Sequence, residues 1–259
     1  VEPCRVNVAE LDILSADEAL IFVHLMKTGG TSLFQALHRK YPEEQIFHYV
    51  PRKEGSRLED LEGLTPDQKA QLKFIHGHAR FGFHRHLKQP SRYITMLREP
   101  VSRVVSLYYF IHQNPQREMP EAERCPTLQD YLDKPLKAFD NAQTRAIAGI
   151  VSAEFKPGHC TTELLDIAKK NLDTCLMVGV TERFDESIVI LKRVLDLQAV
   201  FYARTNENPQ RPKVREISQE DIEKIKHYNQ LDIALYTYAN ELLDKKICKL
   251  GQVFQDEYQ

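Results

Sequence analysis

Residues 24–32, with the sequence HLMKTGGTS, constrain the fold more than any other stretch of this chain. They follow an apolar run at residues 19–23, which predicts a buried strand, and they precede residues 33–37, which predict a helix. Paired glycines allow a sharp turn that brings backbone N–H groups close to an anion, and Lys27 adds a full positive charge. A strand, a basic glycine turn and a helix together predict a phosphate-binding loop.

The order of residues in this loop excludes one common interpretation. Lys27 precedes the two glycines, whereas the ATPase loop G-x-x-x-x-G-K-[ST] places its lysine after them. The following helix is expected at about residues 31–40, and Thr31 and Ser32 are expected to cap it and to offer hydroxyl donors. The alternative is an ordinary strand–helix turn with a surface lysine.

Composition favours one large domain. The 259 residues suffice for a single sizeable core, and a net charge of −2 excludes a general nucleic-acid-binding surface. No apolar run approaches 18 residues and no signal peptide is visible, so no membrane span is expected in this chain. Because the chain begins at Val1 rather than Met, an upstream leader or anchor remains open. The sequence fixes no oligomeric state.

The five cysteines are scattered and form no C-x-x-C pair: Cys4, Cys125, Cys160, Cys175 and Cys248. This spacing suggests neither a zinc ribbon nor a disulfide framework. A reducing compartment is the simplest interpretation, and one disulfide is the alternative.

Strands and helices alternate along the chain. Apolar runs predict further strands at residues 45–50, 73–76, 92–97 and 175–180. Helical spacing or caps predict helices from residues 65, 100 and 218, and at residues 128–132, 141–150, 163–172 and 185–197. The last helical region runs to about residue 246 with a break near Asn229. Residues 114–126 are rich in proline and charge, and are expected to form a surface loop or substrate lid.

This order predicts an α/β fold: a single P-loop-like domain whose central, mainly parallel sheet is flanked by helices, with a helical C-terminal half. We assign residues 1–18 to a polar lead-in, residues 19–250 to the domain and residues 251–259 to a C-terminal tail.

A second candidate segment lies at residues 97–106. Arg98 ends a predicted strand, and Ser106 follows eight residues later, two turns into a helix. A guanidinium can fork onto a phosphate, and a hydroxyl on the same side of the helix can donate to it. The alternative makes Arg98 a structural partner of Glu99 or of a carboxylate in the sheet.

A third segment, His76-Gly77-His78, leaves the strand at residues 73–76. Two histidines separated by one residue can project to the same side of an extended chain, and one of them can act as a general base near neutral pH. The alternatives are a buried, hydrogen-bonded pair, or a metal site that also uses His84 and His86. No H-E-x-x-H pattern or matching cysteine favours the metal.

In their shared order the three segments resemble the sulfotransferases that use 3′-phosphoadenosine 5′-phosphosulfate (PAPS), above all the heparan sulfate 2-O- and 6-O-sulfotransferases and their bacterial relatives. The resemblance spans about residues 20–247. His76-Gly77-His78 resembles the 2-O branch, and four other segments resemble the 6-O branch: residues 140–145, 168–172, 178–182 and 231–236. Met26 replaces the usual proline, and the chain lacks the tryptophan that the 6-O branch carries beside its catalytic histidine.

The resemblance implies an enzyme that transfers a sulfuryl group in line from PAPS to an acceptor hydroxyl on a carbohydrate or glycan, leaving 3′-phosphoadenosine 5′-phosphate (PAP). His78 is the expected base, and His76 either orients it or binds the acceptor. Lys27 neutralises the leaving phosphate, and no metal is required. The expected donor-binding residues are Lys27, Thr28, Gly29, Gly30, Thr31, Ser32, Arg98, Ser106, Thr205 and Arg211. The expected acceptor-binding residues, for an anionic glycan, are Arg80, His84 and Arg85, and the alternative is a solvated basic face.

Three other functions stay open: sulfation of a small hydroxylated metabolite, a P-loop small-molecule kinase, and a non-catalytic nucleotide- or glycan-binding module. A kinase would need Mg²⁺ and an acidic motif to hold it, and no such motif is evident. The expected location is the cytoplasm for a complete bacterial chain and the Golgi lumen for a trimmed eukaryotic one.

Overall fold

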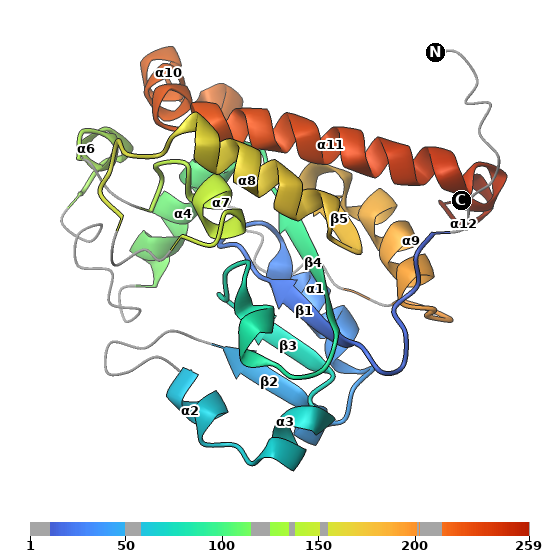
Figure 1. The fold of residues 1–259 in the computed structure, drawn as a ribbon. Coiled ribbons are helices and arrows are strands. Elements are labelled where there is room, and N and C mark those ends of the chain that lie inside the picture. Colours follow the sequence, from blue (N-terminus) through green and yellow to red (C-terminus); the bar gives the residue numbers. More distant parts are fainter. Residues whose placement is uncertain are drawn as a thin grey trace.

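The computed structural model describes residues 11–49, 58–114, 125–134, 138–150, 155–200, 202 and 214–258. Five parallel strands form one sheet in the order β2-β3-β1-β4-β5 (Figure 1). The strands are β1 (Ala19–Val23), β2 (Ile46–Tyr49), β3 (Phe74–Gly77), β4 (Ser91–Leu97) and β5 (Met177–Val180). The α/β fold with a parallel sheet is therefore confirmed.

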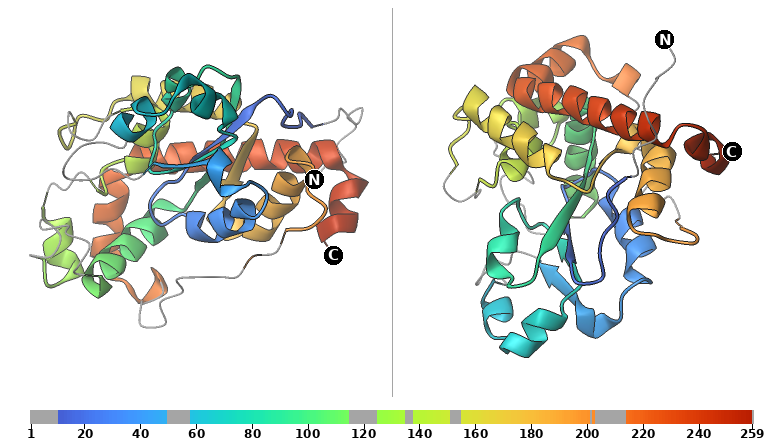
Figure 2. Two further views of the ribbon diagram at one scale, coloured as in Figure 1. Left: turned by 90° about the horizontal axis from the view of Figure 1, so that it is seen from below. Right: turned by 45° about the vertical axis from the view of Figure 1, so that its right-hand side comes forward.

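Helices cover both faces of this sheet, and Figure 2 shows α1 and α9 on one face and α3, α7 and α8 on the other. The N-terminal helices are α1 (Gly30–His38), α2 (Leu58–Glu62), α3 (Pro66–Gln71) and α4 (Pro100–Gln113). The helices of the C-terminal half are α6 (Leu128–Leu132), α7 (Ala142–Ile147), α8 (Thr162–Asp173), α9 (Phe184–Val194), α10 (Gln219–Tyr228), α11 (Gln230–Leu250) and α12 (Gln252–Tyr258). The long helix α11 lies against β5, α8 and α7 (Figure 1).

Local signals in the sequence account for several of these elements. Thr65 and Gln68 form the predicted capping box at the start of α3, and Pro100 opens α4. The helical region after Ser218 breaks at Asn229, as predicted, between α10 and α11. Helices α2 and α12 were not predicted, and residues 251–259 were expected to be a tail. Phe254 of α12 is buried, and α12 packs against α9.

Two hydrophobic clusters support the fold. The larger one surrounds the sheet, and all five residues of β1 are almost completely buried, as expected for the central strand. The smaller one joins α4, α6 and α10 through Val104, Tyr131 and Ile225. It places α4 beside the carboxyl end of the sheet, where its side chains reach the loop that follows β1.

Residues 140–145 join α7 to α11 by reciprocal caps. The Asn141 Oδ1 atom accepts hydrogen bonds from the backbone of Leu231 and Asp232 at 2.9 and 3.0 Å. In return, the buried Asp232 carboxylate accepts from Gln143 N at 3.1 Å and from Thr144 N and Oγ1 at 2.7 and 2.8 Å. This segment, quoted above for its resemblance to the 6-O branch, therefore holds two helices together.

Asp232→Asn should lower the free energy of unfolding by about 2–4 kcal/mol. In the parent protein both carboxylate oxygens accept from buried N–H groups, whereas the asparagine amide would place an NH₂ donor against one of these donors and leave it without an acceptor. Urea unfolding measures this loss. Glu241→Ala is the matched control, an exposed acidic residue on the same helix, and should stay within about 0.5 kcal/mol of the parent. Equal stabilities of the two variants would contradict the capping role.

The cysteines divide into two groups. Cys248 is disulfide-bonded, whereas Cys125, Cys160 and Cys175 are free thiols. Cys4 lies outside the described residues. A disulfide was the alternative interpretation of the cysteine pattern, and a reducing compartment was the simplest one. Disulfides persist mainly in oxidising compartments, so the bond at Cys248 argues against a reducing compartment. In the described part of the chain, no helix is long and apolar enough to cross a membrane.

Candidate active site

The three candidate segments meet at the carboxyl edge of the sheet. The central strand β1 lies between β3 and β4, and Val23 pairs with Gly77 on one side and Thr95 on the other. The loop after β1, His78 after β3 and Arg98 after β4 consequently leave neighbouring strands at the same edge. Open α/β sheets bind their ligands at this edge.

The loop after β1 has a left-handed backbone at two positions, Lys27 (φ 67°) and Gly29 (φ 78°). Such a conformation is uncommon for a lysine and costs energy unless neighbouring groups hold it. Here the Thr28 hydroxyl donates to Leu25 O at 2.9 Å, so this side chain closes the loop from within. The Thr181 hydroxyl donates to Thr28 O at 2.8 Å and so ties the loop to the end of β5.

Helix α1 begins at Gly30, one residue earlier than predicted, with Gly29 as its N-cap residue. The expectation that Thr31 and Ser32 cap the helix is wrong, since both lie inside the first turn and no side chain caps the N-terminus. The left-handed Gly29 starts the helix early. A helix N-terminus without a side-chain cap presents backbone N–H groups and partial positive charge to an anion.

Glycine is required at position 30 by the packing of a neighbouring ring. A Cβ atom placed there would lie 2.0 Å from the His24 ring, far inside van der Waals contact. The His24 ring therefore sits directly against the start of α1. Sequence reasoning assigned the paired glycines to backbone turning, but at Gly30 the reason is close approach by His24.

Lys27 extends toward α4. Its Nζ atom lies over the Phe110 ring, 3.9 Å from the ring centroid. The contact is a cation–π interaction, worth about 0.5–1 kcal/mol at a partly exposed site. It keeps the ammonium group on the α4 side of the loop.

Arg98 braces the same loop from β4. Its Nη1 atom donates to Lys27 O at 3.0 Å, and its Nε atom lies 3.7 Å from Glu182 Oε1. The Gln143 amide exchanges two hydrogen bonds of 2.9 Å with the Arg98 backbone. Ser106 is buried two turns into α4. Arg98 and Ser106, both expected to bind the donor, thus lie at or beyond the end of β4, and Glu182 is a partner that the sequence did not suggest.

Three histidines form a cluster beside the loop: His24, His76 and His78. The ring centroid of His24 lies 5.2 Å from that of His76 and 5.0 Å from that of His78. His24 Nδ1 and His76 Nε2 share a hydrogen bond of 3.2 Å. His76, on β3, also stacks on Phe34 of α1, with 4.0 Å between ring centroids, so its ring is packed between the sheet and that helix.

The tautomer of His78 follows from its contact with the backbone. His78 Nδ1 lies 2.8 Å from His24 O. A carbonyl oxygen can only accept, so Nδ1 carries the proton and, in the neutral ring, Nε2 is the basic nitrogen. This orientation is the one that a general base requires.

The other two histidines stay neutral. Burial, with the charges of neighbouring groups, lowers the pKa of His24 to about 3 and that of His76 to about 2. Their pKa in the unfolded chain is about 6.5. Between about pH 6.5 and 3 the unfolded state therefore binds more protons than the folded state, and the free energy of unfolding must fall as the pH falls.

We expect His76→Gln to reduce the stability lost between pH 7 and pH 5 by about 1–2 kcal/mol, since each titrating histidine contributes at most about 1.4 kcal/mol per pH unit. Urea unfolding at both pH values measures it. His227→Gln, which changes an exposed histidine on α10, should leave the pH dependence as it was. An unchanged pH dependence in His76→Gln would show that this ring is not a buried neutral group.

The predicted acceptor residues are not equivalent. The Arg80 side chain donates to Ile150 O, and burial lowers its pKa, so it is engaged within the fold. Arg85 is exposed, and so is His84, whose Nδ1 atom lies 2.8 Å from Tyr93 Oη. Thr205 and Arg211 lie outside the described residues, as do most of residues 114–126.

Residues 38–257 match the family model described as galactose-3-O-sulfotransferase. The chain is 26% identical to human heparan-sulfate 6-O-sulfotransferase 1, over 90% of this chain and 67% of the human protein. It is 24% identical to chicken heparan-sulfate 6-O-sulfotransferase 2, over 88% of this chain and 68% of that protein. A crystal structure of a sulfotransferase from Alicyclobacillus acidocaldarius is 14% identical, with a TM-score of 0.43, over 89% of this chain and 97% of that one. The family model and the two heparan-sulfate sulfotransferases confirm the predicted resemblance to sulfotransferases, and the chain belongs to the galactose-3-O-sulfotransferase family.

Proposed function

We propose that this protein transfers a sulfuryl group from PAPS to a hydroxyl group of a glycan, with His78 as the general base. One observation carries the proposal: His78 is oriented by His24 O at 2.8 Å, and the His24 ring packs on the N-terminus of α1, the predicted anion site. Base and anion site thus share one residue as their support. The family membership and the heparan-sulfate sulfotransferases among the relatives support the reaction and the glycan class.

The donor fits two parts of the site. The N-terminus of α1, with Lys27 beside it, suits the 5′-phosphosulfate, because N–H groups and a full positive charge converge there. Arg98 and Ser106 are proposed to bind the 3′-phosphate. A guanidinium has five N–H donors, so Arg98 can keep its bond to Lys27 O and still donate to a phosphate.

In the proposed reaction the acceptor oxygen attacks the sulfur atom, and the bond from sulfur to the bridging phosphate oxygen breaks. His78 Nε2 takes the proton of the acceptor hydroxyl. PAP leaves with the electron pair of the broken bond, and Lys27 stabilises the negative charge that develops on its phosphate. Lys27 and Arg98 supply the positive charge in this scheme.

Calorimetric titration with PAP in the presence of EDTA tests the donor. We expect PAP to bind at least tenfold more tightly than 5′-AMP, because only PAP carries the 3′-phosphate that Arg98 and Ser106 are proposed to hold. Preference for Mg-ATP over PAP would favour the kinase alternative instead. Equal affinity for PAP and 5′-AMP would contradict the proposal that Arg98 and Ser106 bind a 3′-phosphate.

An acceptor screen tests the glycan. The exposed basic residues His84 and Arg85 follow the base in the chain, and their charge suits a sulfated or uronate-containing glycan. Sulfation of such glycans in preference to neutral sugars and small phenols is the expected result. Exclusive sulfation of a small hydroxylated metabolite would replace the glycan as acceptor.

We infer an oxidising compartment such as the Golgi lumen for this chain, because Cys248 is disulfide-bonded. Mass spectrometry of peptides from the unreduced protein should recover Cys248 in a cross-linked peptide. Recovery of Cys248 only as a free thiol in protein from its native source would favour the cytoplasm.

A further inference from the structure

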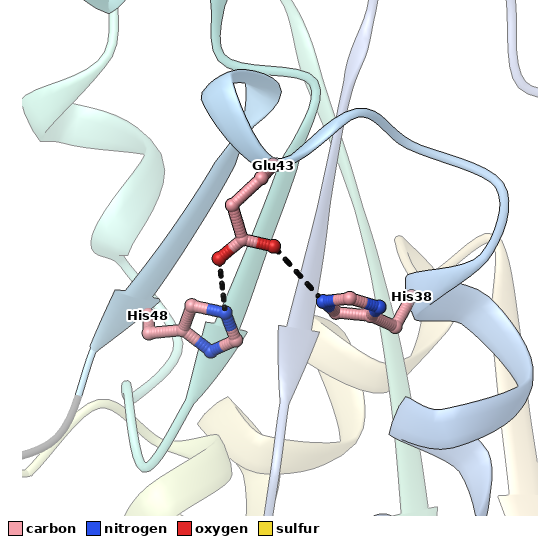
Figure 3. Close-up of side chains that lie close together, drawn as sticks. All are labelled: His38, Glu43 and His48. Atoms are coloured by element: carbon pink, nitrogen blue, oxygen red, sulfur yellow. Dashed lines mark hydrogen bonds and ion pairs between the residues drawn. The ribbon is translucent and has the colours of Figure 1, made fainter.

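Three side chains with metal-binding groups, none of which was assigned a part in sulfuryl transfer, converge beside His76: His38, Glu43 and His48 (Figure 3). The ring centroids of His48 and His76 lie 5.9 Å apart. His38 is the last residue of α1, Glu43 begins the 3₁₀ turn η1 (Glu43–Gln45), and His48 lies on the edge strand β2. Figure 3 shows the Glu43 carboxylate between the two rings, with one oxygen toward each. These three residues are distinct from His76, His78, His84 and His86, the histidines whose spacing in the sequence suggested a metal site.

The separations of these groups suit one small cation. His38 Nε2 lies 3.0 Å from Glu43 Oε2, and His48 Nε2 lies 3.8 Å from Glu43 Oε1. All three potential ligand atoms lie within 4.8 Å of one another. Tetrahedral zinc with bonds of about 2.0–2.1 Å places its ligands about 3.3 Å apart. Small side-chain rotations would therefore bring the three atoms to zinc-binding distances.

The two rings share a supporting side chain. The Phe34 ring meets the His38 ring and the His48 ring edge to face, each with 5.2 Å between ring centroids. His48 is also fixed through its backbone, since β2 pairs with β3 and places His48 opposite His76. Phe34 and the sheet thus hold both imidazoles beside Glu43, which reduces the reorganisation needed for metal binding.

The salt bridges among these side chains contribute little to the stability of the arrangement. The side chains of His38 and Glu43 are 43% and 71% exposed, and exposed ion pairs contribute about 0–1 kcal/mol. Two imidazoles and a carboxylate are, by contrast, a ligand set that zinc uses with water in the fourth position. The set also excludes Mg²⁺ and Ca²⁺ as good candidates, because these ions prefer oxygen ligands.

We propose that His38, Glu43 and His48 bind one Zn²⁺ ion, with water as the fourth ligand. The ion would join the end of α1 to the edge strand β2 through three residues that are near one another in the chain. It would stabilise the folded state in proportion to its concentration, because the unfolded chain does not hold the three ligands together. None of the three ligands is among the residues proposed for sulfuryl transfer, a scheme that uses no metal, although His48 lies beside His76.

The test is titration of the metal-free protein with Zn²⁺ against a chromophoric chelator. We expect one ion per chain, with affinity reduced at least tenfold in each of His38→Ala, His48→Ala and Glu43→Gln. His227→Ala and Glu44→Gln are the matched controls, an exposed histidine elsewhere and the neighbouring exposed glutamate, and should bind zinc like the parent protein. Circular dichroism establishes that each variant is folded.

Two results would overturn the proposal: failure of the parent protein to bind Zn²⁺ at micromolar concentration, or binding that survives in all three ligand variants. The second result would assign the ion to another group, such as the cluster of His24, His76 and His78. Should a variant fail to fold, the visible absorption spectrum of Co²⁺ bound to the parent protein tests the coordination geometry instead. The intense visible absorption of tetrahedral cobalt supports the site, and the weak absorption of octahedral cobalt contradicts it.

Discussion

His78→Ala should lower kcat by about 10²–10⁴-fold while leaving the affinity for PAP within about twofold of the parent. The size of the loss is that of general-base catalysis. Donor affinity should persist because His78 is not among the residues proposed to bind PAPS, and its ring is oriented by a backbone carbonyl, that of His24. Steady-state transfer assays and PAP titration measure the two quantities separately.

The matched control is His227→Ala, which removes an exposed imidazole from α10. It should retain both the parent kcat and the parent affinity for PAP. Raising the pH should not restore His78→Ala, because the imidazole proposed to accept the proton is absent at every pH. Unchanged turnover in His78→Ala would contradict the assignment of His78 as the general base.

Lys27→Ala should lower kcat by about 10²–10³-fold, the usual loss when one preorganised group that stabilises transition-state charge is removed. Donor affinity should also fall, by about tenfold, because the proposed contact with the donor exists in the ground state as well. The fold should survive, since the cation–π contact with Phe110 is worth about 0.5–1 kcal/mol. The same two assays measure these changes, with thermal unfolding as the check on folding.

Lys249→Ala provides the control for charge. Lys249 is exposed on the last turn of α11 and lies outside the proposed site. Its removal should change neither turnover nor PAP affinity, which separates a specific role of Lys27 from the net charge of the protein. If Lys27→Ala keeps full turnover at saturating donor, charge stabilisation comes from Arg98 or from the backbone.

Local signals explain why so much of the fold could be predicted. The Thr65 cap, the proline at position 100 and the apolar strands each act over a few residues, so the sequence reveals them directly. Helix α12 could not be predicted in this way, because it depends on burying Phe254 and on packing against α9. The start of α1 was misplaced by one residue because the left-handed Gly29, and not a hydroxyl residue, begins it.

The residues of the candidate site also divide into those that local sequence signals reveal and those that depend on distant contacts. Lys27, Arg98 and His78 could be singled out because each follows a predicted strand. His24 could not, because its role arises from a contact with His76, 52 residues away. Thr181 was missed for the same reason, since it bonds the loop across 153 residues. Thr28 was expected to cradle the donor through its backbone, and the structure adds that its side chain turns inward to close the loop.

Transfer of labelled sulfate from PAPS tests the account most directly. The folded protein is incubated with ³⁵S-labelled PAPS and a uronate-containing, partly sulfated glycan, without added metal. We predict label in the glycan and one PAP released per sulfate transferred, with His78→Ala producing at least 100-fold less. Tight binding of PAP together with no label in any hydroxyl acceptor would contradict the account and identify a non-catalytic binding module.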